Sequence, residues 1–185
     1  TIYLLVYLLV FGLPIRVAVA TPTNPDVVKG VAGVTQTGNN TTVTMNSKKA
    51  VINWDGLNTS SNEVLQFVKA SGHFTVLNRV SKGGATQFDG SLFGNQGHII
   101  IVNPKGIVFG TTAIVDAYKF TASALDIKNE DFMNGIYKFA GGDGPGKVAV
   151  GDDDHPRFDG GRHAAADAVD PALLEHPQQL RLQGE

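Results

Sequence analysis

The feature that most constrains the fold is the way Gly, Asn and Pro interrupt short apolar strands between Val51 and Ile127. The sharpest example is the stretch IIIVNPKGIVFG at residues 99–110, where a β-branched strand ends at Asn103 and a new strand begins a few residues later. Pro104 lacks a backbone donor and disfavours helix for the residue before it, while Gly106 can adopt a positive φ. The pattern predicts short stacked strands and not an alternation of strands with helices.

The composition is typical of a turn-rich all-β chain. Its 185 residues can hold one modest domain, include 22 Gly, and are only 17% charged, compared with roughly 25% in typical soluble domains. The net charge of -2 and the pI near 6.2 give no electrostatic reason to expect a nucleic-acid partner. The sequence has no Cys, so neither a disulfide framework nor a thiolate metal site can form.

The N-terminus has features of an export signal. Ile2–Leu13 is an almost unbroken apolar run that is short for a membrane span, and the A-V-A at residues 18–20 is a pattern that a signal peptidase cuts before Thr21. The basic segment that normally precedes such a run is missing, which indicates a truncated start. We therefore predict a cleaved signal peptide over residues 1–20, with a buried strand or an N-terminal membrane anchor as alternatives.

From Asp26 to about Ile127 the pattern predicts a succession of strands. The expected strands lie at residues 41–45, 50–54, 63–68, 74–80, 87–94, 98–102, 113–116 and 120–127. Ile99–Val102 and Ile107–Phe109 are continuous apolar runs, as expected for strands buried on both faces. No segment has the helical period that crossover connections would need. These observations favour a parallel β-helix, although periodicity alone leaves a sandwich open.

Five ordered blocks of this region resemble one known family. The blocks are Ala50–Trp54, Asn78–Val80, Gly90–Gly97, Asn103–Gly110 and Phe120–Ile127, and residues 129–132 and 137–139 continue the pattern. In order and spacing they resemble the N-terminal two-partner-secretion domain of filamentous-haemagglutinin-type exoproteins, especially the high-molecular-weight-adhesin branch. The resemblance covers roughly residues 30–142. The family's Asn-Pro-Asn-Gly-Ile motif stands here as NPKGI at residues 103–107, so that Lys105 replaces one Asn.

The resemblance implies an all-β fold, namely a right-handed parallel β-helix with an N-terminal cap. It also implies a secretion-recognition domain in a Gram-negative bacterium, recognised in the periplasm by a dedicated outer-membrane transporter that exports the exoprotein to the cell surface. Folding of the β-helix would then start at the capped end and add one coil after another. Host-surface or glycan receptors would be bound by a downstream passenger. We expect no enzymatic activity, no cofactor, no metal and no nucleic acid.

The candidate recognition residues come from the motifs that carry the resemblance. The set is Asn53, Asn78, Arg79, Asn103, Pro104, Gly106 and Ile107. Asn103 can bond backbone groups at a coil corner whose φ is fixed by Pro104. We expect the Asn residues of the set and Gly106 to hold turns that shape the recognised surface, with a purely structural turn role as the alternative. Arg79 either pairs with a local carboxylate or faces the transporter.

Other residues bear on a second functional class. Trp54 and Phe67 lie in apolar strands and are expected in the core. Parallel β-helices also include polysaccharide lyases and hydrolases, which need clustered acids, so a carbohydrate-active enzyme is the alternative function. The acids within residues 51–127 are widely scattered, and His73 and His98 lack acids at ligand spacing.

The C-terminal part has a different character. After Gly146 the strand pattern is expected to stop, and Asp, His, Arg, Pro and Ala dominate. We predict that residues 21–146 are a partial secretion domain, truncated at its C-terminal end, and that residues 147–185 are a disordered tail arising from a frame change or early termination. A natural linker is the alternative. The last coil, near residues 120–127, would then expose an open edge unless another segment covers it.

Overall fold

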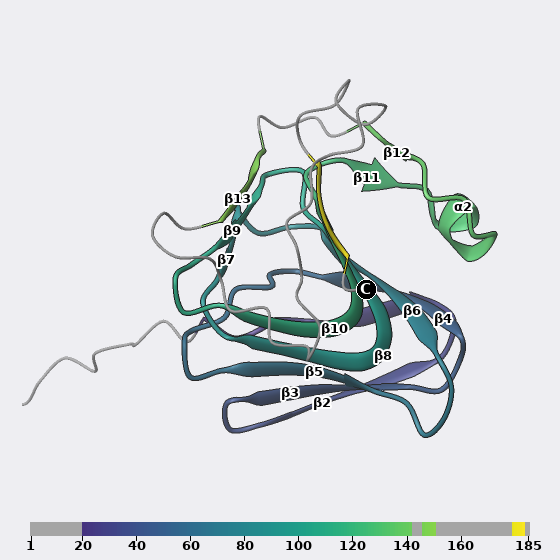
Figure 1. The fold of residues 1–185 in the computed structure, drawn as a ribbon, viewed down its shortest axis with the longest axis horizontal. Helices are drawn as coiled ribbons and strands as arrows, with labels where there is room; N and C mark the ends of the chain where they lie inside the picture. The colour runs from purple at the N-terminus through teal and green to yellow at the C-terminus, as the bar shows by residue number, and fades with distance from the viewer. Residues whose placement is uncertain (1–19, 142–145, 151–178, 184–185) are drawn as a thin grey trace, which may run out of the picture.

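The structure is a computed structural model that describes residues 20–141 and 146–150 and the backbone of residues 179–183 (Figure 1). It contains 57% strand and 4% helix and forms a β-solenoid of about four turns, which confirms the predicted all-β parallel β-helix. The predicted signal peptide and most of the predicted tail lie outside the described residues.

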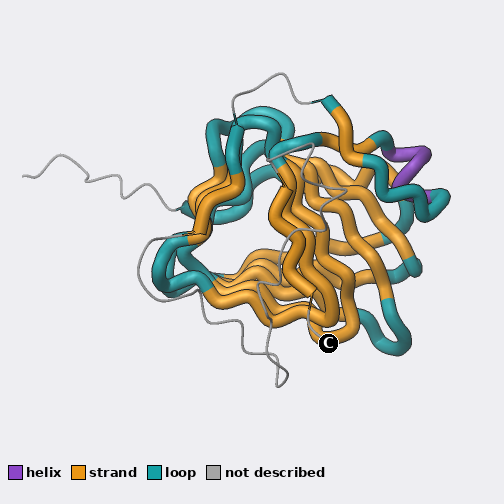
Figure 2. Tube along the Cα trace, turned by 45° about the horizontal axis from the view of Figure 1, so that its top comes forward, coloured by secondary structure: helices purple, strands orange, loops and turns teal. Residues whose placement is uncertain are grey.

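Three faces wrap around one core (Figure 2). The first face contains β3 (Asn40–Met45), β5 (Val64–Val68) and the first halves of β8 (Ser91–Val102) and β10 (Ile114–Ser123). The second contains β4 (Lys49–Trp54), β6 (Phe74–Val80) and the second halves of β8 and β10. The third contains β7 (Thr86–Phe88), β9 (Ile107–Phe109) and β13 (Val148–Val150). Neighbouring strands on each of these faces run parallel, as expected for a coil that rises in one direction.

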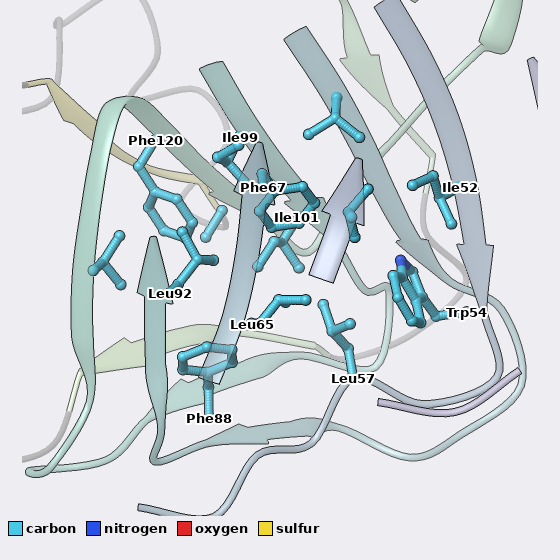
Figure 3. Packing of buried hydrophobic residues seen from close by; sticks show 14 of the residues in the cluster. Ile52, Trp54, Leu57, Leu65, Phe67, Phe88, Leu92, Ile99, Ile101 and Phe120 are labelled. Carbon is cyan, nitrogen blue, oxygen red and sulfur yellow. The ribbon is translucent and has the colours of Figure 1, made fainter. Parts of the chain in front are cut away.

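Side chains of successive turns stack in columns inside the coil. On the second face, Ala50 pairs with Val76, Val76 pairs with Ile99, and Ile99 pairs with Phe120. All four side chains belong to one buried apolar cluster, whose packing is seen in Figure 3. The predicted core residues Trp54 and Phe67 are in this cluster too. Because the strand period places every second side chain inside, the alternation of each strand builds this core.

The N-terminal end of the coil is closed by antiparallel strands. β2 (Ala32–Thr37) forms a hairpin with β3, and β1 (Asp26–Lys29) pairs antiparallel with β4. An unpaired parallel edge would offer free backbone groups to another chain, and these two strands occupy that edge on the first and second faces of the first turn. The N-terminal cap implied by the family resemblance is therefore present.

The fourth turn carries a long excursion. Thr86 pairs with Ile107, which is 21 residues on, but Ile107 pairs with Val148, which is 41 residues on. The extra residues form β11 (Asp126–Ile127), α2 (Asn129–Met133) and β12 (Phe139–Ala140), which lie outside the second face (Figure 1). We refer to these three elements together as the excursion.

The excursion gives the second face an outer apolar layer. Ile127 and Phe132 form a second buried cluster with the outward-facing side chains of β4, β6 and β8, which are Val51, Leu77, Ile100 and Val102. Burial of Ile99–Val102 on both faces is thereby confirmed. The same prediction is wrong for Ile107–Phe109, because Val108 in the middle of β9 is half-buried. The third face receives no such outer layer from the excursion.

Two strands lie beyond the expected end of strand structure at Gly146, so that expectation is wrong. β13 follows at once, since Val148-Ala-Val resumes pairing with β9 after the excursion. β14 (Gln179–Gln183) pairs antiparallel with β10 over Lys119–Ser123 and covers the edge that would otherwise be open. A strand of three residues such as β13 gives too short a pattern to identify from sequence.

Candidate functional site

The corner between the second and third faces is held by Asn103. This residue is 1% exposed, and its Nδ2 donates to the carbonyl of Gly84 and to Oγ1 of Thr86, both at 3.0 Å. Its Oδ1 accepts from the backbone N–H of Lys105 at 2.9 Å, and its carbonyl accepts from the N–H of Gly106 at 2.9 Å. One amide thus fixes its own turn and joins it to the turn below, as the sequence predicted for a coil corner.

The other motif residues complete this corner. Gly106 has φ +108°, and a Cβ placed there would lie 2.9 Å from the carbonyl oxygen of Lys147, so only Gly fits without strain. Ile107 is fully buried and donates its N–H to that same carbonyl at 2.9 Å. Lys105 is exposed, and its Nζ reaches the carbonyl of Gly83 at 2.8 Å. Pro104 is half-buried beside it.

Asn53 and Asn78 do not hold turns, and the turn assignment for them is wrong. Asn53 lies within β4 and Asn78 within β6. Asn78 is fully buried in the interior column, where its Oδ1 accepts from Nε1 of Trp54 at 3.1 Å and its Nδ2 donates to the carbonyl of Ile100 at 3.3 Å. An Asn can occupy a buried strand when its amide is paired, and the indole N–H supplies that partner. Its role in recognition stays a prediction.

Arg79 joins the coil to the excursion. Its Nε donates to Oδ1 of Asp126 at 2.8 Å, and its Nη1 donates to Oδ1 of Asn129 at 2.8 Å and to Oδ1 of Asn53 at 3.2 Å. Its Nη2 donates to the carbonyl of Ile127 at 2.5 Å. The side chain is 15% exposed, so the guanidinium is bound locally. The pairing with a carboxylate that the sequence left open is the arrangement found.

The seven candidate residues therefore occupy three separate places. Asn103, Pro104, Gly106 and Ile107 make the corner, Asn78 lies in the interior, and Asn53 meets Arg79 beneath the excursion. Sequence reasoning missed Lys49, whose Nζ donates to the carbonyls of Phe132 and Met133, both at 3.0 Å. Little in the sequence indicated this role for Lys49, because a Lys at the start of a strand is usually solvated.

Among the described residues, no group of three or more His, Asp or Glu side chains is placed to hold a metal ion. In the same part of the chain, no helix is long and apolar enough to cross a bilayer.

Comparison with known proteins bears on the fold and its role. A sequence profile of the TPS (two-partner secretion) secretion domain matches residues 18–170. The crystal structure of the HMW1 secretion domain from Haemophilus influenzae superposes with a TM-score of 0.60 and 33% identity, covering 71% of this chain and 37% of that one.

Two curated relatives are longer proteins. Both are described as heme/hemopexin-binding proteins of Haemophilus influenzae, and both are 27% identical to this chain, over 107 and 103 residues. The matches cover 58% and 56% of this chain but only 12% and 11% of the relatives. The similarity is thus confined to a small part of each relative. With its capped parallel coil and a profile match over far more than half its length, the chain belongs to the TPS secretion domain family.

Proposed function

We propose that a partner transporter in the outer membrane of a Gram-negative bacterium binds this secretion domain in the periplasm. Through this binding the transporter recognises the exoprotein that carries the domain. In this proposal residues 1–20 direct export across the inner membrane and are removed before Thr21. The observation that carries the proposal is the coil with its N-terminal end closed by antiparallel strands, in a chain that belongs to the family. A coil capped there can begin a longer β-helix, because each later turn needs only the turn before it.

The recognised surface is proposed to be the outside of the Asn103 corner. Asn103 is buried and cannot itself present much surface, so its contribution is to position the residues around it. Lys105 is the exposed residue of the motif, and Pro104 beside it is half-buried. The amide would therefore fix the shape of the corner, while the Lys105–Pro104 surface would make the contact.

Receptor binding is proposed to lie outside this domain. The curated relatives are named for binding heme and hemopexin, and this chain matches only about a ninth of their length. We propose that host-surface or glycan ligands are bound by downstream segments of the exoprotein. A carbohydrate-active enzyme stays the alternative function, and membership of a secretion domain family supports the main proposal.

A secretion assay with the partner transporter tests the proposal. The wild-type chain should be secreted when the transporter is supplied and should bind the transporter's periplasmic domains in a pull-down. Asn103→Ala should lose both, and Lys105→Glu should weaken binding while leaving the fold intact by circular dichroism. Lys48→Glu is the matched control, because it makes the same charge change at an exposed lysine between β3 and β4, at a different corner of the coil.

Two results would count against the proposal. A wild-type chain that is neither bound nor secreted in the presence of its transporter would overturn it. Depolymerisation of an acidic polysaccharide by the purified chain would favour the enzymatic alternative.

A further inference from the structure

The residues that follow the proposed cleavage point are fixed one by one onto the first turn of the coil. Pro22 is buried, and its carbonyl accepts a hydrogen bond from Nε2 of Gln36. Thr23 forms an antiparallel bridge with Gly56, with the N–H of Thr23 donating to the carbonyl of Gly56 at 2.9 Å. The segment is therefore anchored from its first residues, and Thr21 stands at its start.

Thr21 contacts a buried carboxylate. Glu63 is buried, with 3% of the residue exposed. Its Oε1 accepts a hydrogen bond from Oγ1 of Thr21 at 2.6 Å, and its Oε2 accepts one from the N–H of Ser60 at 2.6 Å. Within the described residues the ion pairs are Arg79–Asp126 and Lys82–Asp55, and neither includes Glu63. A buried carboxylate that has hydrogen bonds but no cation beside it retains much of its desolvation cost.

We propose that Glu63 is the binding site for the α-ammonium group of Thr21, which exists only after the bond between Ala20 and Thr21 has been hydrolysed. The inference rests on the removal of residues 1–20 in the proposed function. Hydrolysis adds one water across that bond: Ala20 keeps the new carboxylate and leaves with the signal peptide, while Thr21 keeps the amine, which takes up a proton.

Covalent geometry places the new charge near Glu63. The backbone nitrogen of Thr21 is three bonds from its Oγ1, and Oγ1 already contacts Glu63. Before cleavage this nitrogen is a neutral amide. After cleavage it is an amine whose usual pKa is about 7.7–8.0, so it is mostly protonated at neutral pH. A carboxylate near the ammonium group favours the protonated form of the amine.

The consequence is a cap that tightens on maturation. The ion pair would tie the start of the mature chain to the turn that precedes β5, beside the hairpin that closes the coil. Among the described residues, Thr21 of the unprocessed chain contacts Glu63 through its hydroxyl group. Removal of the signal peptide would thus stabilise the N-terminal end of the domain.

A double-mutant cycle on the mature chain, residues 21–185, tests the proposal. The chain is prepared with a free Thr21 amine and with the same amine acetylated, each with Glu63 and with Glu63→Gln, and unfolding is followed in urea. Acetylation should lower the folding equilibrium constant about tenfold when Glu63 is present, a value between those of exposed and buried pairs, and less than twofold with Glu63→Gln. An equal effect of acetylation in both backgrounds would overturn the proposal.

A second measurement does not depend on a variant that folds. Nitrogen NMR of the unsubstituted mature chain should give a pKa for the Thr21 amine above its usual range, and a pKa within that range would overturn the proposal. Thr21→Val, which keeps the amine but removes the hydroxyl, should retain the raised pKa of the amine.

N-terminal sequencing of exported protein tests the cleavage point separately, and a start other than Thr21 would also overturn the proposal. Failure of secretion would count against the transporter role but would leave the result of the cycle intact.

Discussion

Asn53 and Arg79 lie opposite each other on the parallel strands β4 and β6, and the guanidinium of Arg79 donates from Nη1 to Oδ1 of Asn53 at 3.2 Å. The same guanidinium bonds Asp126 and Asn129 of the excursion. Two motif residues that are 26 positions apart therefore act together, and what they bind is the layer that covers the second face. This geometry assigns Arg79 a structural role within the domain.

Arg79→Met should destabilise the domain, because it leaves Asp126 without its cation and removes the hydrogen bonds to the excursion. We expect the free energy of unfolding in urea to fall by about 2–4 kcal/mol. Lys82→Met, which breaks the more exposed pair with Asp55, should cost about 1 kcal/mol or less. Equal effects of the two substitutions would contradict the role given to Arg79.

Gly106→Ala should strain the Asn103 corner. At φ +108° an alanine is unfavourable, and its Cβ would press against the carbonyl of Lys147, so a loss of about 1–3 kcal/mol in unfolding free energy is expected. The matched control is Gly84→Ala, because Gly84 belongs to the same corner and a Cβ there meets nothing within 4 Å. A corner that tolerates both substitutions equally well would show that the left-handed conformation is unimportant.

Asn78→Leu should be costly although leucine suits an apolar column. It leaves Nε1 of Trp54 without its partner and removes the bond to the carbonyl of Ile100, and each unpaired buried group costs about 1–3 kcal/mol. Adding Trp54→Phe removes the indole N–H that has lost its partner. The double variant should therefore lose less unfolding free energy than the sum of the losses in the two single variants. Strict additivity in thermal or urea unfolding would mean that the two side chains are not coupled.

Asp55 should carry a pH dependence of the N-terminal segment. The hydrogen bond from Asn24, followed by contact with Lys82, holds the pKa of Asp55 below its usual value of 3.8. The folded pKa is depressed, so its contribution to stability is present above pH 3.8 and is lost as pH falls through the lower folded pKa. Carbon NMR of the Asp55 carboxyl should show this titration, and Asn24→Ala should move its midpoint upward. An unchanged midpoint would contradict the assigned cause.

Local patterning predicted the short strands and their corners, but it left a sandwich open, and the family resemblance was needed to select the solenoid. A β-branched run that ends at Asn103-Pro104 and restarts after Gly106 forces a corner, and continuous apolar strands such as Ile99–Val102 require cover on both faces. What the sequence did not reveal is the source of that cover. The excursion places Phe132 over the second face through contacts between distant residues, and local patterning contains no trace of them.

The candidate site was predicted unevenly for the same reason. The side-chain hydrogen bonds of Asn103 lie within its own turn or in the turn directly below, so turn chemistry was a good guide. Asn78 looked like a turn residue because Asn usually is one, but Trp54 supplies the donor that lets it stay in a strand. Arg79 was left open because its acceptors Asp126 and Asn129 are far along the chain.

The stacked register of Ala50, Val76 and Ile99 has a mechanical consequence. The backbone strands of each turn pair with those of the turns beside it, but the excursion of the fourth turn also bonds Lys49 of the first turn and Arg79 of the second, so a load applied at one end of the chain would meet these cross-links as well as the stacked layers. In the proposed export, every layer that closes beyond the transporter would hinder backward slippage of the segment behind it. Such a coil would work as a ratchet that converts its own folding into directed movement.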